Sequence, residues 1–382
     1  MHAPPYASLA KLHPFMKQNL KPPTVTDVAR SAGVAVGTVS RVLNGAPNVD
    51  GAIRDRVLAA ARSLGYDRLR KPKRRQLPPA PARFGAATNV AVICFGMEDT
   101  LVQLPVVSRA VHGIERAAAA EGASLMLANI PDGSRIPSFL SQQKVLGVIL
   151  KGPNQGLLPP PKSNPLLDAL THVPKVWLLG RPPNAVGDHC NFDPWHAGRL
   201  VADHLLACGH RRIAFLNPKP GQVQFAALEQ GLALALLAHG LPLQRLESIP
   251  TASLAWPLPA TTSAENVTAL VRTWHDTPAA DRATALFVPS DKTSSQVYAA
   301  LERFGLRVGR DVSVISCNNE ESIATSLQPT LTSVDIHGDA VGQRAVAQLY
   351  WRSRNPESSP NAQILVEPTL IVRASVQRIQ PD

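Results

Sequence analysis

Residues 24–45 read TVTDVARSAGVAVGTVSRVLNG, and this pattern predicts two short helices joined by one tight turn. Thr24 is suited to cap the first helix, and Asp27, three residues later, favours the same helix N-terminus. Gly33 is suited to the turn, because a residue without a Cβ adopts a positive φ at no steric cost. The layout is typical of a helix-turn-helix, whose second helix reads the major groove of DNA.

The second helix is expected over residues 36–43, with Asn44 and Gly45 ending it. Its buried face consists of Val39, Val42 and Leu43. The face left free to enter a groove consists of Val36, Gly37, Thr38, Ser40 and Arg41. A third helix is expected after Asp50, which completes a three-helix bundle that needs no metal. A helical hairpin without a role in DNA reading is the alternative interpretation of the spacing alone.

The positive charge of the chain is concentrated around this motif. Residues 1–83 contain 15 Lys and Arg against 4 Asp and Glu, whereas residues 84–382 contain 24 of each. The whole net charge of +11 therefore belongs to the first segment. Basic side chains that neutralise DNA phosphates release condensed counterions, so such a segment is typical of a nucleic-acid-binding module. A solvated basic tail is the alternative, but a tail would not carry helix caps and a buried face.

Length and composition indicate a folded protein of two or three domains. The first 15 residues lack an apolar core followed by a cleavage signal, and no stretch approaches the roughly 18 apolar residues that span a membrane. The cysteines lie far apart without a CxxC pair, as expected for reduced core residues. We therefore expect a cytoplasmic protein with no membrane partner. These cysteines are Cys94, Cys190, Cys208 and Cys317.

Beyond residue 88 the pattern changes to strands that alternate with helices. The continuous apolar run 89–95 is typical of a parallel strand buried on both faces. Further strands are expected at 124–128, 145–150, 175–179, 212–216, near 247, 285–288, 313–316 and 364–372, with a crossover at 332–335. Helices are expected at 106–120, 197–207, 226–239, 264–275, 296–304 and 339–351. This alternation predicts an α/β fold of two doubly wound lobes with parallel sheets and a ligand cleft between them.

Four segments follow from these patterns. Residues 1–21 form a flexible N-terminal extension, and residues 22–66 form the helix-turn-helix DNA-binding domain. Residues 67–88 form a basic, Pro-rich linker that is extended by its prolines. Residues 89–382 form the two-lobed effector-binding and dimerisation domain.

Several short motifs, in a fixed order, carry a resemblance to a known family. After the helix-turn-helix come GRP at 180–182, GHRRIAF at 209–215, PSD at 289–291, GLRVGRDVSV at 305–314 and PTLTSV at 329–334. Together these motifs resemble the lactose-repressor (LacI) family of bacterial transcription regulators over nearly the whole chain after residue 22. The resemblance implies a periplasmic-binding-protein-like effector domain and a homodimer on a two-fold symmetric operator. It also implies a repressor whose DNA affinity is switched by a small molecule, a sugar or sugar derivative, bound between the lobes.

The resemblance assigns the DNA contacts residue by residue. Val36 and Gly37 open the reading helix and face bases, with Ser40 and Arg41 behind them. Arg41 is able to pair with a guanine or to clamp a phosphate. Gly37 has no side chain, so direct readout from the helix start should be poorer than in relatives with two polar residues there. The phosphate contacts, which position the protein without specifying sequence, are assigned to Thr24, Thr38, Asn44 and Asn48.

The linker departs from the family pattern. Relatives carry a hinge helix there that wedges a leucine into the minor groove, whereas this chain has Pro72 inside that segment. A proline inside a helix costs roughly 3 kcal/mol, so we expect no ordinary hinge helix. Arg74 and Arg75 are expected to track a narrow minor groove instead.

The resemblance also implies cleft residues. Asp291 matches an Asn-Asp position after a strand, and Asn318 stands where many relatives place an Asp. Trp256 stands where relatives hold an aromatic ring against the ligand. Other ligand-facing positions are occupied by Gln103, at the mouth of the first lobe, and by Lys151 and Asp193. For every one of these cleft residues, lobe packing or a helix cap is the alternative role.

One arginine of the family's cleft has no counterpart here. Many relatives hold the effector with an Arg after the first strand of the second lobe, and none occurs between Arg212 and Arg245. Its substitutes are expected among Lys219, Gln222 and Gln224. Together with Lys151, this departure leaves room for an anionic or acidic-sugar effector.

Two other functions compete with a regulator. The chain has no P-loop, no GxSxG and no HExxH motif, so we expect neither an enzyme nor a cofactor or catalytic metal. A solute-binding protein of a transporter shares the two-lobed fold, but the basic helical head and the missing signal peptide argue against it. A sugar-metabolising enzyme and a solute-binding protein therefore remain the alternatives to a regulator.

Overall fold

The computed structural model describes residues 23–46, 49–66, 89–101, 104–249, 256–259 and 264–379. The chain divides into two compact units, residues 1–83 and 84–382. The predicted extension 1–21 and linker 67–88 lie outside the described residues, as does the hinge segment around Pro72.

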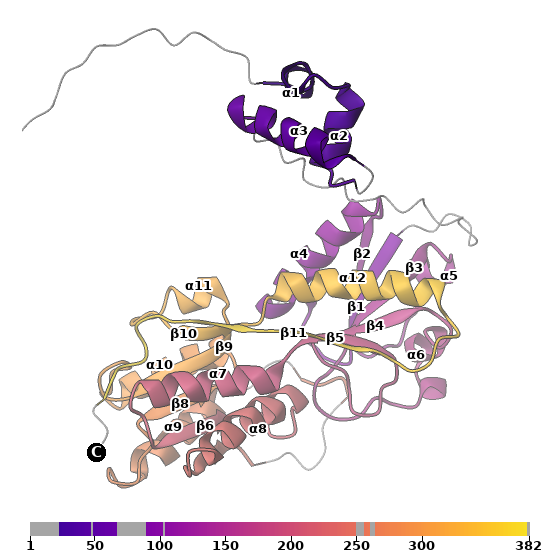
Figure 1. Ribbon diagram of the computed structural model, residues 1–382. Coiled ribbons are helices and arrows are strands. Elements are labelled where there is room, and N and C mark those ends of the chain that lie inside the picture. The colour runs from indigo at the N-terminus through magenta and orange to yellow at the C-terminus, as the bar shows by residue number, and fades with distance from the viewer. Residues whose placement is uncertain are drawn as a thin grey trace, which may run out of the picture. The chain divides into compact units, whose positions relative to one another are not determined.

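The first unit contains the three expected helices, α1 (Val25–Ala32), α2 (Val36–Leu43) and α3 (Gly51–Ser63), as Figure 1 shows. Thr24 begins α1 with a capping box: Asp27 N–H donates to the Thr24 hydroxyl, and the Asp27 carboxylate accepts from Thr24 N–H at 2.9 Å. Gly33 ends α1 with a φ of +64°. The Asp50 carboxylate caps α3. The sequence pattern of this unit is therefore confirmed down to its caps.

The three helices close on a small apolar core. Arg56 of α3 donates from Nη2 to the Ala32 carbonyl at 2.7 Å, which satisfies one of the free carbonyls at the C-terminus of α1. Burial of valine and alanine side chains from all three helices provides the rest of the stability. The buried members are Val28, Ala29, Ala32, Val39, Val42, Val57, Ala60 and Ala61.

The second unit consists of two lobes, each built on a six-stranded sheet with helices packed against it (Figure 1). Lobe 1 has the strand order β11-β5-β4-β3-β1-β2, and all of its pairs are parallel. Its strands are β1 (Asn89–Phe95), β2 (Leu125–Ile130), β3 (Val145–Lys151), β4 (Lys175–Leu178), β5 (Asp188–Phe192) and β11 (Gln363–Val366). Its helices are α4 (Pro105–Ala120), α5 (Ser138–Ser141), α6 (Pro165–Ala169) and α12 (Gly338–Arg354).

Lobe 2 has the strand order β12-β10-β9-β8-β6-β7, and β12 is the antiparallel member. Its strands are β6 (Ile213–Asn217), β7 (Leu243–Glu247), β8 (Ala285–Val288), β9 (Ser313–Asn318), β10 (Thr332–Asp335) and β12 (Thr369–Ile371). Its helices are α7 (Pro194–Ala207), α8 (Val223–Leu237), α9 (Ala264–Asp276), α10 (Asp291–Arg303) and α11 (Glu321–Ala324). The predicted class, a helix-turn-helix head with two doubly wound lobes, is confirmed.

Within the described residues, the chain passes between the lobes at three places. It leaves lobe 1 after β5, returns between β10 and α12, and leaves again between β11 and β12, along the yellow segment of Figure 1. In lobe 1, α12 packs on α4 so closely that a Cβ on Gly342 would lie 2.0 Å from the Ala110 carbonyl oxygen. Glycine is therefore required at this helix crossing.

Several boundaries differ from the sequence prediction. The single strand expected at 364–372 is two strands, β11 and β12, which join different sheets. The segment 332–335, expected as a crossover, is strand β10, and β5 was missed because its sequence DHCNF is not continuously apolar. Helix α10 starts at Asp291 rather than at 296, because Ser290 caps it by accepting from Thr293 N–H at 3.3 Å.

Further sequence expectations concern the cysteines, membrane spans and metals. All four cysteines are buried and free, as expected for core residues. No helix within the described ranges is both long enough and apolar enough to cross a membrane. The same ranges contain no group of three His, Cys, Asp or Glu side chains that would hold a metal ion.

Candidate functional site

The first candidate surface is the exposed face of α2. Val36 at its start is 47 % exposed, and Gly37 and Arg41 are exposed as well. A Cβ on Gly37 would meet no atom within 4 Å in the described part of the chain. Gly37 is therefore not required by packing, and it leaves a bare spot at the start of this helix.

The residues expected to contact phosphates lie at the ends of α1 and α2. Thr24 is exposed, and its hydroxyl donates to Asp27 Oδ2 at 2.6 Å. Asn44 is exposed and donates from Nδ2 to the Ser40 hydroxyl at 3.3 Å. Thr38 is half-buried. The predicted contacts Asn48, Arg74 and Arg75 lie outside the described residues.

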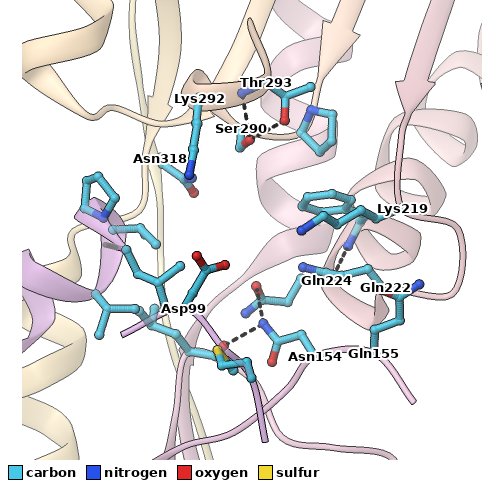
Figure 2. A pocket seen from close by; sticks show the side chains of 18 of the residues that line it. Asp99, Asn154, Gln155, Lys219, Gln222, Gln224, Ser290, Lys292, Thr293 and Asn318 are labelled. Carbon is cyan, nitrogen blue, oxygen red and sulfur yellow. Dashed lines mark hydrogen bonds between the residues drawn. The ribbon is translucent and has the colours of Figure 1, made fainter. Parts of the chain in front are cut away.

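The second candidate site is a cavity of about 220 Å³ between the two lobes. It lies where the strands of both sheets end, as expected for open parallel sheets. Lys151 ends β3 and Asn318 ends β9, while Asp99, Lys219 and Ser290 follow β1, β6 and β8. Figure 2 shows the side chains of Asp99, Lys219 and Lys292 pointing into this cavity from different sides.

Hydrogen bonds between the lobes close one side of this cavity. They join the loop after β3 in lobe 1 to the start of α8 in lobe 2, and Figure 2 shows the amide side chains involved. Asn154 donates from Nδ2 to Gln224 Oε1 at 3.0 Å, and Gln155 donates from Nε2 to the Pro220 carbonyl at 2.7 Å. Val223 N–H donates to the Asn154 carbonyl at 2.9 Å. The described structure is therefore a form with the lobes in contact.

Lys151 is a buried cation in the cavity wall, with a residue exposure of 6 %. Its ammonium donates to the Gly152 carbonyl at 2.6 Å and to Asn154 Oδ1 at 3.5 Å. Neither acceptor is charged, and among the described residues no carboxylate forms an ion pair with it. Burial lowers the pKa of Lys151 to about 8.

Glu320 brings a second buried charge from lobe 2, and it too is 6 % exposed. Its Oε1 accepts from Asn318 Nδ2 at 3.4 Å, whereas its buried Oε2 finds no hydrogen-bond partner in the described structure. Burial, and after it the charge of Asp291, raise the pKa of Glu320 to about 7. An unsatisfied buried carboxylate oxygen is costly unless a further donor reaches it.

The seven residues expected to bind the effector divide into three groups. Lys151, Gln222 and Asn318 line the cavity. Gln103 lies outside the described residues. Asp193, Trp256 and Asp291 are not among the side chains that line the cavity.

These last three side chains have other contacts. Asp193 caps α7 by accepting from Trp195 and His196 N–H, each at 3.0 Å. Trp256 packs edge-on against Phe95 with ring centroids 6.4 Å apart. Its position therefore corresponds to lobe packing, and that of Asp193 to a helix cap.

Asp291 lies beneath the cavity and is fully buried. It accepts from the Ser316 hydroxyl at 2.6 Å, the Ser333 hydroxyl at 2.7 Å and Glu320 N–H at 2.5 Å. Burial raises its pKa to about 6. Asp291 therefore holds the loop that carries Asn318 and Glu320, and its own side chain does not line the cavity.

The sequence reasoning missed three charged residues of the cavity lining. Asp99, Lys292 and Glu320 each lie four residues after the end of a predicted strand, at 95, 288 and 316. The signal was therefore present, since ligands bind beyond the carboxyl ends of parallel strands. A search for charged residues just after the predicted strands would have identified these three without any family motif.

Two family models match the chain. The model for bacterial regulatory proteins of the lacI family matches residues 24–68, and that for a periplasmic binding protein-like domain matches residues 202–376. Among curated relatives, the HTH-type transcriptional repressor PurR of Mannheimia succiniciproducens is 27 % identical over 93 % of this chain and 99 % of its own length. The HTH-type transcriptional regulator CelR of Thermobifida fusca is 28 % identical over 92 % and 98 %.

Among solved structures, too, the chain is similar to transcriptional regulators. A complex of the transcriptional regulator CelR with cellobiose has a TM-score of 0.61 at 26 % identity, covering 93 % of this chain and all of that one. A lac repressor dimer bound to operator and an anti-inducer has a TM-score of 0.57 at 24 % identity, covering 94 % of this chain, and supports the fold alone. The chain therefore combines a helix-turn-helix domain of the lacI family with a periplasmic binding protein-like domain, and it is similar over nearly its whole length to transcriptional regulators of that composition.

Proposed function

We propose that this protein is a repressor that binds a two-fold symmetric operator as a homodimer and changes its operator affinity when a small sugar or sugar derivative binds between the lobes. The observation that carries the proposal is the cavity at the carboxyl ends of both sheets, which amide and charged side chains line together with apolar ones. Its volume of about 220 Å³ lies below the roughly 300–1,000 Å³ of pockets for drug-sized ligands, and it suits a molecule the size of a monosaccharide.

The cavity lining supports a hydroxylated ligand. Amide side chains from both lobes line it, and an amide both donates and accepts hydrogen bonds, as a sugar hydroxyl does. The amides are Asn154, Gln155, Gln222, Gln224, Gln296 and Asn318. The cellobiose complex of a related regulator supports the same ligand class.

The connections between the lobes support the switch. Three crossings in the described residues and a few amide hydrogen bonds link the lobes around the cavity. A ligand that binds one lobe arrangement better than another therefore shifts the balance between the arrangements. Two copies of the reading helix α2 in a homodimer would meet two successive major grooves of a symmetric operator. Arg41, exposed on α2, is then the side chain best suited to specify a base.

The test uses the full-length protein throughout. Selection from random duplex DNA identifies the preferred site, sedimentation gives the oligomeric state on that site, and fluorescence anisotropy then measures affinity with and without sugars. We expect a symmetric site, one dimer per site, and a change in operator affinity with at least one sugar or sugar derivative. Selection that yields no preferred sequence would contradict a repressor, and turnover of a bound sugar would favour the enzyme alternative.

A further inference from the structure

The cavity is lined by two buried charged side chains, Lys151 and Glu320, which recognition of a neutral sugar does not require. A buried ammonium is stable only when charged or polar acceptors surround it, and Lys151 has two neutral oxygens. One of these contacts, to Asn154 Oδ1, is 3.5 Å long and therefore weak. The ammonium has three donors, so it is able to bind a further acceptor from the cavity side.

Two more lysines line the same space. Lys219 follows β6 and Lys292 lies in the first turn of α10, and both point into the cavity in Figure 2. Asp99 is the carboxylate close to Lys219. Among the described lining residues there is no arginine, so lysine is the cation available to an anionic group.

Lys151 needs an acceptor from the ligand, whereas Glu320 needs a hydrogen-bond donor. Its buried Oε2 lacks a donor within the described structure, and Glu320 lies in lobe 2 while Lys151 lies in lobe 1. A ligand that spans the cavity would therefore meet an ammonium from one lobe and an unsatisfied carboxyl oxygen from the other. A hydroxyl group is the donor that fits the second requirement, since Glu320 would repel an anion.

We propose that the effector is a small polyhydroxy acid, whose anionic group, a carboxylate or a phosphate, binds the Lys151 ammonium while one of its hydroxyls donates to Glu320. This inference rests on the proposed function and specifies the substrate class of the same cavity. The anion adds a charged acceptor to a buried cation whose two acceptors in the protein are neutral. Because its two ends contact different lobes, the same ligand also favours the form in which the lobes are in contact.

The experiment compares matched ligands on the full-length protein by isothermal calorimetry at pH 7. The probes are glucose, gluconate, glucuronate and glucose 6-phosphate, so the two carboxylates and the phosphate are tested separately against a neutral sugar. We expect at least one acid to bind about tenfold or more tightly than glucose, the effect of one hydrogen bond to a charged group. Glucose binding as tightly as every acid, or no binding by any acid, would overturn the proposal.

Variants assign the anionic group to its partner. Lys151→Met should lower the affinity for the acid by about tenfold or more while changing that for glucose little. Lys175→Met is the matched control, because Lys175 also lies in lobe 1 and donates to backbone carbonyls but does not line the cavity. Lys151→Arg keeps the charge and should retain the preference for acids. An unchanged acid preference in Lys151→Met would place the anionic group elsewhere.

Glu320→Gln tests the other end of the ligand. A glutamine keeps one acceptor oxygen, so we expect a moderate loss of affinity for the polyhydroxy acid and little change for an acid without hydroxyl groups, such as propionate. Equal losses for both acids would contradict a hydroxyl contact at Glu320. If an acid binds but never alters operator affinity, the proposed function fails while the ligand class stands. If glucose alone alters operator affinity, the proposed function stands and this inference fails.

Discussion

The two units of this protein place their charges in opposite ways. The first, residues 1–83, carries a large excess of Lys and Arg, and the described ones such as Arg30 and Arg41 lie at its surface. The second has equal numbers of basic and acidic residues, yet it buries Lys151, Asp188, Asp291 and Glu320.

The difference separates two kinds of recognition. Exposed cations attract a polyanion over a distance set by the Debye length, so their contribution depends on salt more than on geometry. A buried charge acts through single contacts, and its protonation depends on pH. The DNA-binding unit is therefore suited to a long, uniformly charged partner, and the effector unit to one small molecule.

Two buried charges in lobe 1 contrast with each other. Asp188 is fully buried and accepts from Arg352 and Gln348 of α12 and from Ala362 N–H. Lys151 has no charged partner among the described residues. The first charge is compensated within the protein and the second is not, so removing the cation should lower stability at the Asp188–Arg352 pair and raise it at Lys151.

The largest expected effect comes from Arg352→Met. This substitution leaves the Asp188 carboxylate buried without its cation, and breaking a buried pair in this way typically costs about 3–5 kcal/mol. Urea denaturation followed by tryptophan fluorescence measures it, because every tryptophan of the chain lies in residues 84–382. A loss below about 1 kcal/mol would mean that water reaches Asp188.

Lys151→Met should raise the stability of the protein, in contrast to Arg352→Met. Burial lowers the pKa of Lys151 from 10.5 to about 8, so its ammonium reduces stability at pH 7, and this loss disappears as the pH rises from 8 to above 10.5. The free energy of unfolding of the variant should exceed that of the wild type by on the order of 3 kcal/mol at pH 7. This difference should shrink at high pH, where Lys151 is neutral in the folded and the unfolded protein. Denaturation at several pH values tests this. A variant that is less stable at pH 7 would show that Lys151 is held by contacts within the protein.

Arg41→Ala tests the exposed charges of the first unit. Loss of a base or phosphate contact should weaken operator binding by about 1–3 kcal/mol. Arg62→Ala is the matched control, since it removes the same charge from α3. Anisotropy at two salt concentrations separates the two roles: a base contact changes specificity, and a phosphate contact changes the salt slope. Equal effects of both substitutions would mean that Arg41 acts only through charge.

The smallest effect is expected from Gly37→Ala. Glycine inside a helix is less stable than alanine by roughly 0.5–1 kcal/mol, and the added Cβ meets nothing within 4 Å in the described structure. Thermal denaturation of the variant should therefore show a slightly more stable first unit, with operator affinity unchanged or improved. A loss of operator affinity would indicate that DNA backbone or bases approach Gly37 too closely for a methyl group.

The cavity was only partly predictable from sequence. Lys151, Gln222 and Asn318 were expected there and line it, whereas Asp193 and Trp256 match family positions but have a cap and a packing contact instead. A motif fixes where a residue lies along a strand or loop. The direction in which its side chain points depends on neighbours from distant segments of the chain. Trp256, for example, packs against Phe95.

The sequence by itself determined the helix-turn-helix, because its caps, its glycine turn and its apolar spacing are local and act within a few residues. It also determined the alternation of strands and helices that gives two parallel sheets. Only the tertiary structure decided that residues 363–371 divide between both sheets and that Lys151 and Glu320 meet one cavity from different lobes. The physical reason is that strand pairing and the burial of charge depend on segments far apart in the chain, which no local pattern records.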